Sequence, residues 1–343
     1  MQLNSAKFTV TGDWSAVFDD MYERGFTDGL PVIPPTAEAV ARMLEAAGMQ
    51  SDELIGVLPP EGGPATAEKV AINAVMAGCR PEYFPVVVAA IRAVADPKFN
   101  LLGVQTTTNP VGPVLVVNGP VRKAIDMNCG RGCLGPGRRA NATIGRALRL
   151  CLLNIGGCPP GDVDKAIHGM PGKFSFCYGE AEEESPWEPL HVENGFRREQ
   201  STVTAVAGQG TQNIYAAFHD VDAIITMLAD GMAVYGNNGY LRAQGNPLLI
   251  FTPGHARLFA DAGWTKKRIR DELFERTKIP RGRIPRSVQL SKPVYLDYDD
   301  SQACLICPDP ESILITVAGG PEPYHITYVP NFGTTLFSMA EVR

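Results

Sequence analysis

The stretch from Cys129 to Thr143 has the most chemically suggestive pattern in the sequence. It reads Cys-Gly-Arg-Gly-Cys-Leu-Gly-Pro-Gly-Arg-Arg-Ala-Asn-Ala-Thr and leads into an apolar helical pattern. Glycines let a backbone approach a ligand closely, and a helix N-terminus presents free N–H groups and a partial positive charge. Arg138 and Arg139 add guanidinium groups that suit carboxylate or phosphate. Asn141 and Thr143 add hydrogen-bonding groups, so the stretch predicts an anion-binding cradle for a small anionic molecule.

The same stretch contains a weak form of the dinucleotide-binding fingerprint, with Gly135, Gly137 and Ala140 at the required spacing. No strand pattern directly precedes it, and no acidic residue about 20 positions further on is clearly placed to bind a ribose. We therefore reject a Rossmann-type nucleotide site. A purely structural alternative stays open, in which an acidic loop elsewhere in the chain holds the basic start of the helix.

Three cysteines are candidate catalytic nucleophiles. Cys129 and Cys133 lie in the cradle, and Cys79 lies in a Gly-Cys-Arg-Pro turn between two predicted helices. A thiol close to arginines and to a helix N-terminus should have a lowered pKa and react more readily. Cys151 is a contrast, because it lies on the apolar stripe of the predicted helix 141–155 and should be inert.

Two histidines are candidate bases. His255 follows the predicted strand 248–252 across a Pro-Gly turn, where a helix N-terminus would lower its pKa and favour the neutral imidazole. The alternative is a histidine that only caps its own helix. His191 is the second candidate, because Glu193 would lie on the same face of a strand and could hold the ring. Separately, the acidic run 182–184 could orient an arginine.

Three predicted strands end in turns rich in glycine and proline: 114–118, 248–252 and 313–317. In open α/β sheets, ligands collect at the carboxyl ends of strands. This rule favours above all His255, just past the end of 248–252; Asn118 and Gly319 lie at the other two ends, so we include them among the substrate-binding candidates. The simpler alternative is that these glycines and prolines only form the turns.

Short apolar strand patterns alternate with helical patterns along the chain, which is typical of an α/β fold. We expect a layered sheet of short strands with helices packed on it. A boundary near residue 200 would divide it into an N-terminal α/β lobe with the cradle, 1–200, and a C-terminal α/β lobe, 201–343. Further predicted elements are helices at 66–77, 221–235 and 265–277 and strands at 53–58, 101–107 and 202–207.

The composition excludes several classes of protein. The chain has 343 residues, and its net charge of −6 disfavours sequence-independent nucleic-acid binding. The sequence contains no run of about 18 apolar residues, which a transmembrane helix would need, so no membrane partner is expected. Residues 1–10 lack the pattern of a secretory signal, so we expect a cytoplasmic protein with reduced cysteines. Paired histidines for zinc, a Gly-x-Ser-x-Gly elbow and a phosphate loop are also absent from the sequence.

Four segments resemble a bacterial family whose members are encoded beside, or fused to, small proteins with a Sec/Cys-Gly-Ser-Cys (UGSC) motif. They are Asp28–Thr36, Ala71–Tyr83, Ala140–Ala147 and Ser185–His191, and the similar stretches run from about residue 28 to about residue 320. The resemblance implies thiol-linked redox chemistry and a small UGSC-motif partner subunit. This chain itself contains no Cys-Gly-Ser-Cys.

These observations favour a cysteine-dependent enzyme that acts on a small anionic substrate by lyase, hydrolase or thiol redox chemistry. One alternative is an iron–sulfur or metal-dependent hydro-lyase, in which Cys79, Cys129 and Cys133 would supply three thiolates. Another is a non-catalytic subunit that supports a thiol-bearing partner. The sequence names no cofactor and no dedicated metal site, and we expect an oligomer.

Overall fold

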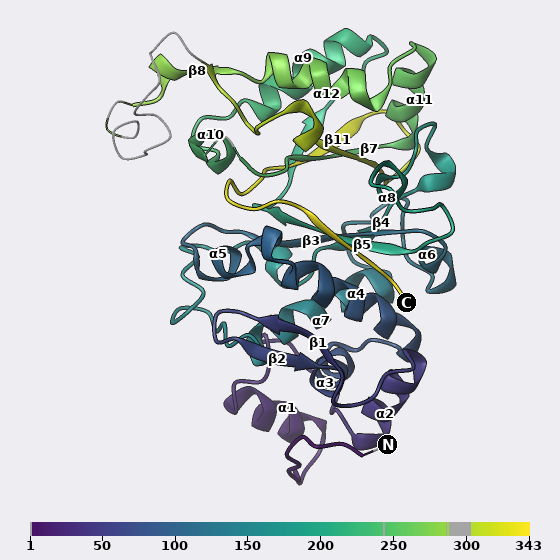
Figure 1. The fold of residues 1–343 in the computed structure, drawn as a ribbon, viewed down its shortest axis with the longest axis vertical. Helices are drawn as coiled ribbons and strands as arrows, with labels where there is room; N and C mark the ends of the chain where they lie inside the picture. Colours follow the sequence, from purple (N-terminus) through teal and green to yellow (C-terminus); the bar gives the residue numbers. More distant parts are fainter. Residues whose placement is uncertain (1, 243, 286, 288–302) are drawn as a thin grey trace.

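The computed structural model describes residues 2–242, 244–285, 287 and 303–343 (Figure 1). These residues form two four-stranded sheets that stack face to face, with helices on both outer faces. The first sheet has the order β12-β5-β3-β4 and the second has the order β10-β7-β11-β6. The strands are β3 (Gly112–Asn118), β4 (Cys177–Gly179), β5 (Thr202–Gly208), β6 (Gln212–Tyr215), β7 (Leu248–Phe251), β10 (Leu314–Val317), β11 (His325–Val329) and β12 (Ser338–Glu341).

Both faces of the central strands are buried, which explains their nearly continuous apolar sequences. In β3, Leu115 and Val117 face the helices of the N-terminal half, whereas Val114 and Val116 face the second sheet. This alternation follows from the two-residue period of a strand. β3 is parallel to β4 and β7 is parallel to β10, while the other pairs within the two sheets are antiparallel.

Helices cover the two outer faces of the stacked sheets. α4 and α7 pack on the first sheet with α3 behind them, and α9 and α11 pack on the second sheet with α12 behind them. None of the helices in the described ranges is both long and apolar enough to cross a membrane. The six helices are α3 (Ala67–Ala77), α4 (Phe84–Ala95), α7 (Arg139–Asn154), α9 (Val221–Met232), α11 (Pro253–Asp261) and α12 (Lys266–Arg276).

The N-terminal end of the molecule adds a further layer outside α3 (Figure 1). Two helices and an antiparallel strand pair form it, and residues 2–13 precede the first helix. Shorter elements connect the main ones. The remaining helices and strands are α1 (Trp14–Glu23), α2 (Ala37–Ala46), β1 (Leu54–Leu58), β2 (Gly63–Thr66), α5 (Leu101–Thr106), α6 (Val121–Ala124), α8 (Leu190–Glu193), α10 (Asn238–Arg242), β8 (Ile279–Pro280) and β9 (Ala303–Cys304).

The structure confirms the α/β fold class, but the predicted strand at 101–107 is wrong. This segment is the helix α5, because Asn100 adopts a left-handed conformation with φ of 52° and its side chain accepts a hydrogen bond from the Gly103 N–H. A side-chain cap of this kind starts a helix. The domain boundary near residue 200 stays a prediction, and the first sheet contains strands from both sides of it.

Candidate functional site

Three strands end close together at one edge of the stacked sheets. β3 and β4 are parallel, so their carboxyl ends at Asn118 and Gly179 lie side by side. The chain after β4 reaches the second sheet, where the Ala181 N–H donates to the Val317 carbonyl at the end of β10, 2.7 Å away. The edge lies near the labels α6 and α8 in Figure 1. Its position fits the rule that α/β sheets bind ligands at the carboxyl ends of strands.

Arg122, in the short helix α6 after β3, is the centre of this edge. Its side chain is only 3% exposed, and its Nη2 lies 2.9 Å from a Glu182 carboxylate oxygen and 3.1 Å from one of Glu183. Its Nε donates to the Gly119 carbonyl, 2.9 Å away, and its Nη1 donates to the Glu180 carbonyl. The guanidinium therefore ties the end of β3 to the acidic segment after β4. Of the acidic run 182–184, Glu182 and Glu183 contact this arginine, whereas Glu184 lies 3.8 Å from Arg257.

A pair of buried carboxylates lies beside the guanidinium. The Asn118 amide nitrogen donates to Glu180, 2.6 Å away, and to Glu182, 2.9 Å away. Burial raises the pKa of Glu180, which also accepts hydrogen bonds from the Leu190 and Val317 backbone N–H groups. Asn118 therefore holds two acidic side chains together through its amide nitrogen, and its role in substrate binding stays a prediction.

Cys129 is the thiol at this edge. Its Sγ lies 3.8 Å from Arg122 Nη1, and its carbonyl accepts a hydrogen bond from the Gly319 N–H, 2.9 Å away. Cys129 is only partly buried, whereas the other seven cysteines are buried. Burial raises the pKa of the Cys129 thiol and the nearby guanidinium acts against that rise, so the expected lowered pKa is wrong. Gly179 leaves room for the sulfur, because a Cβ there would lie 2.5 Å from it.

His191 lies behind the carboxylates. It belongs to the short helix α8 and not to a strand, and Glu193 bonds to Lys266, 2.8 Å away, instead of orienting the imidazole. The His191 side chain is fully buried, with Nδ1 3.8 Å from a Glu182 carboxylate oxygen. Burial lowers the pKa of His191, which favours the neutral ring. The structure places this histidine near the candidate site, one side chain away from Arg122.

Cys79 lies at a different place, between α3 and the start of α7. Its Sγ donates to the Thr143 carbonyl, 3.3 Å away, and burial raises the pKa of this thiol to about 12. Arg139 donates through Nε to the Gly78 carbonyl, 2.8 Å away, and the Thr143 hydroxyl bonds within its own helix to the Arg139 carbonyl. The expected lowered pKa of Cys79 is therefore wrong, because desolvation outweighs the neighbouring positive charges.

Asn141 connects the loop of Cys129 to the helix α7. Its side chain accepts from the Asn128 N–H at 2.8 Å and donates to the Cys133 carbonyl at 3.1 Å. Burial raises the pKa of Cys133 to about 11, again opposite to the expectation. Arg138 is exposed and pairs with Asp126, 2.8 Å away, so a carboxylate of the chain itself occupies one guanidinium of the expected cradle.

His255 begins α11 on the second sheet and is fully buried. Its Nε2 lies 3.0 Å from the Ala216 carbonyl, and a carbonyl only accepts, so Nε2 carries the hydrogen. Its Nδ1 lies 2.9 Å from the Thr252 hydroxyl, which also accepts from the His255 backbone N–H. Burial lowers the pKa of the ring. Because both ring nitrogens already have partners, the structure favours the alternative in which His255 is bonded within the helix start, where Thr252 is the N-cap.

We expect the change His255→Gln to lower the free energy of unfolding by about 1–3 kcal/mol, because it disturbs a buried hydrogen-bonded group. Alkylation of Cys129 should keep its wild-type rate. Urea unfolding and mass spectrometry measure the two effects. His325→Gln is the control at an exposed histidine, with an expected change within about 0.5 kcal/mol. Slower Cys129 alkylation in a His255→Gln protein of unchanged stability would contradict the cap assignment.

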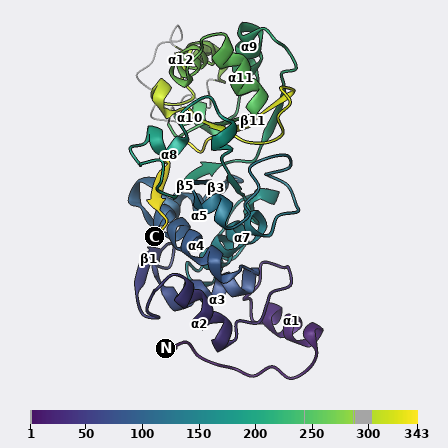
Figure 2. The same cartoon turned by 90° about the vertical axis from the view of Figure 1, so that its right-hand side faces the viewer.

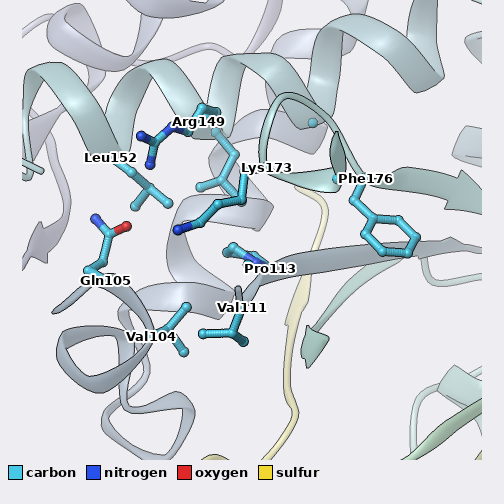
Figure 3. Close-up of a pocket in the computed structure, with 12 residues that line it drawn as sticks. Val104, Gln105, Val111, Pro113, Arg149, Leu152, Lys173 and Phe176 are labelled. Atoms are coloured by element: carbon cyan, nitrogen blue, oxygen red, sulfur yellow. The ribbon is translucent and has the colours of Figure 1, made fainter. Parts of the chain in front are cut away.

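A small cavity between α7 and β3 lies away from Cys129. Figure 3 shows Arg149 and Lys173 at this cavity, whose volume is about 20 Å³. Lys173 lies 2.6 Å and Arg149 3.8 Å from a carboxylate oxygen of Asp164. A space of this size holds about one water molecule. It is therefore too small to be a substrate site.

Comparison with known proteins adds no family. No model of a protein family matches this sequence, and no curated protein matches it.

Over residues 2–242, 244–285, 287 and 303–343, which include all eight cysteines, no three His, Cys, Asp or Glu side chains are grouped to hold a metal ion. The iron–sulfur alternative therefore finds no ligand set in this part of the chain.

Sequence patterns did not indicate two central residues of the edge, Arg122 and Glu180. Arg122 lies three residues after the predicted turn at Gly119, and Glu180 directly follows β4. β4 has three residues, so its alternation does not stand out in the sequence. The rule about strand ends would have identified Glu180 if β4 had been recognised as a strand parallel to β3.

Proposed function

We propose that this chain is a cysteine-dependent enzyme whose nucleophile is Cys129. The observation that carries the proposal is a partly exposed thiol, 3.8 Å from a buried guanidinium, where three strands end. Arg122 favours the thiolate electrostatically, because a positive charge near a thiol stabilises its ionised form. Gly319 supports the role by holding the Cys129 backbone in place.

The chemical step would begin when the Cys129 thiol loses its proton to solvent and the thiolate sulfur attacks a carbonyl carbon of the substrate. The C–S bond forms as the π bond of the carbonyl breaks, and that electron pair moves to the oxygen as an oxyanion. Lyase, hydrolase and thiol redox reactions can all start from such a thiolate. Asn118, Glu182 and His191 would not touch the substrate. They would position Arg122, since Glu182 binds the guanidinium and contacts both of the other residues.

A small anionic substrate remains part of the proposal. Arg131 is two residues from Cys129, is 68% exposed on its side chain, and lies against Gly320 at the end of β10. Arg138 is exposed on the same loop. Each of these arginines pairs with a carboxylate at the surface, Glu322 or Asp126, and a substrate carboxylate would have to displace it. Exposed ion pairs contribute little, about 0–1 kcal/mol, so such an exchange is feasible.

Alkylation with iodoacetamide, followed by peptide mass spectrometry, tests the assignment. At neutral pH we expect Cys129 to react at least about tenfold faster than Cys79 or Cys151, because those two thiols are buried and their pKa values are raised further. The rate at Cys129 should increase with pH, since burial raises its pKa above the ordinary thiol value and only the thiolate reacts. Cys129→Ser is the control that removes this signal.

Two outcomes would overturn the proposal. One is faster alkylation of any other cysteine than of Cys129 in the folded protein. The other is a rate at Cys129 that does not change with pH, because such a thiol would not be titrating in this environment.

A further inference from the structure

A second and larger cavity lies at the N-terminal end of the molecule, within the layer outside α3. Its volume is about 580 Å³, within the range of about 300–1,000 Å³ that small-molecule sites occupy. Its lining comes from the N-terminal segment, α1, α2, α3 and the end of α7, and most of it is apolar. The apolar lining includes Phe8, Val17, Met21, Phe26, Ile72 and Met76.

The segment Leu3–Val10 closes one side of the cavity. The Glu68 carboxylate fastens this segment, because it accepts hydrogen bonds from the backbone N–H groups of Asn4 and Ser5 at distances of 2.8 to 3.1 Å. Figure 2 shows the segment running along the end of the molecule from beside α2 to α1. Phe8 and Phe26 stand at the opening with their ring centroids 6.2 Å apart and remain 47% and 37% exposed. Hydrogen bonds to Glu68 therefore hold the N-terminal segment over the cavity.

Two basic side chains and one acidic side chain line the cavity. Lys7 and Lys69 line it and are exposed, and neither makes a salt bridge within the described ranges. The acidic lining residue, Glu68, already uses its carboxylate on the backbone of the N-terminal segment. Asn73 and Asn154 bond to each other, 2.7 Å apart. An incoming ligand would thus meet two exposed ammonium groups beside an apolar interior, although the charge of Lys7 also acts on Glu68 and helps to lower the pKa of that carboxyl group.

We propose that this cavity binds an anionic amphiphile, a small molecule with a carboxylate head and an apolar chain or ring. The apolar part would fill the space between α1 and α3, and the carboxylate would lie at the opening near Lys7 and Lys69. Burial of the apolar part provides the affinity, because apolar surface is removed from water. The two lysines provide the preference for a negative head group. This site is separate from Cys129 and does not depend on its proposed function.

Titration calorimetry of the full chain with dodecanoate, below its micellar concentration, tests the site. Dodecyltrimethylammonium is the matched probe, with the same alkyl chain and a positive head. We expect saturable binding of dodecanoate and affinity for the cation that is lower by about tenfold or more. Lys69→Gln should weaken dodecanoate binding several-fold, and Lys165→Gln, at an exposed lysine that does not line the cavity, should not.

Two variants that fill the cavity test its location. Ile72→Trp from α3 and Val17→Trp from α1 should each reduce dodecanoate binding by about tenfold or more, because the indole occupies the apolar space. If one of the two variants fails to fold, the other still tests the location. Absence of dodecanoate binding, equal affinity for both probes, or unchanged binding in a folded tryptophan variant would overturn the proposal.

Discussion

Replacing Arg122 by glutamine will lower the free energy of unfolding by about 3–5 kcal/mol, because it leaves buried carboxylate charge without its partner. The Arg122 side chain is 3% exposed and that of Glu182 is 6% exposed, so water cannot replace the lost guanidinium. The same change should slow alkylation of Cys129 at neutral pH, since it removes the positive charge that opposes the rise of this thiol pKa. Urea unfolding and iodoacetamide kinetics measure the two effects.

Lys123→Gln is the matched control for this prediction. Lys123 is the next residue and also binds Glu183, 3.0 Å away, but its side chain is 69% exposed. An exposed pair contributes at most about 1 kcal/mol, so the control should unfold nearly as the wild type does. Equal stability losses in the two variants would show that the network around Arg122 is not a buried one.

The stability difference between wild type and Arg122→Gln should shrink in acid. Burial acts against ionisation of Glu183, but hydrogen bonds from Arg122 and Lys123 outweigh it and lower the pKa to about 2, from an ordinary value of 4.5. A depressed carboxyl pKa stabilises the fold above the unfolded value, and this contribution is lost as the pH falls toward the folded value. Wild type therefore loses stability between about pH 4.5 and pH 2, and the variant loses less.

The strand-end rule indicated Asn118 and Gly319, whereas the Gly/Arg-rich pattern indicated Cys129; His255, which the rule also indicated, lies elsewhere. Asn118, Cys129, His191 and Gly319 lie far apart in sequence, and the structure brings all four to the edge around Arg122. The common reason is topological, because parallel strands deliver their carboxyl ends to one edge. What the rule could not give is the role of each side chain. Asn118 donates to two carboxylates, whereas neither ring nitrogen of His191 has a hydrogen-bond partner in the described part of the chain.

Burial was the property that local sequence could not predict. The Gly/Arg-rich pattern indicated positive charge close to Cys133, and the Gly-Cys-Arg-Pro turn indicated it close to Cys79. The structure does place an arginine, Arg139, near Cys79. Desolvation nevertheless dominates, because the packing of α3 against α7 removes water from that thiol. The burial of a residue depends on segments that are distant in the sequence, so a local motif does not predict it. The segment α5 was mispredicted for a related reason, since its apolar pattern is too short to distinguish strand from helix.

Changing Gly179 to alanine will displace the Cys129 thiol from its place beside Arg122. A Cβ at position 179 would lie 2.5 Å from the Cys129 sulfur and 3.3 Å from the Met127 side chain, so one of these neighbours must move. Overpacking of this kind costs about 1–3 kcal/mol. Because Gly179 is in β4, between buried neighbours, the sulfur is the atom free to turn toward solvent. We expect alkylation of Cys129 to lose its dependence on Arg122, so that Gly179→Ala and the double change Gly179→Ala/Arg122→Gln react alike.

Gly130→Ala provides the matched control, because Gly130 adjoins Cys129 in the chain and has an ordinary backbone conformation. A Cβ there would meet only the Asn128 side chain, at 3.7 Å, which is normal van der Waals contact. This variant should keep both the wild-type stability and the sensitivity of Cys129 to Arg122. If Gly179→Ala also kept that sensitivity, the pairing of thiol and guanidinium would not depend on the space beside β4. The role assigned to Gly179 would then be wrong. If only Gly130→Ala kept the sensitivity of Cys129 alkylation to Arg122, the reactivity of Cys129 would depend on the space beside Gly179.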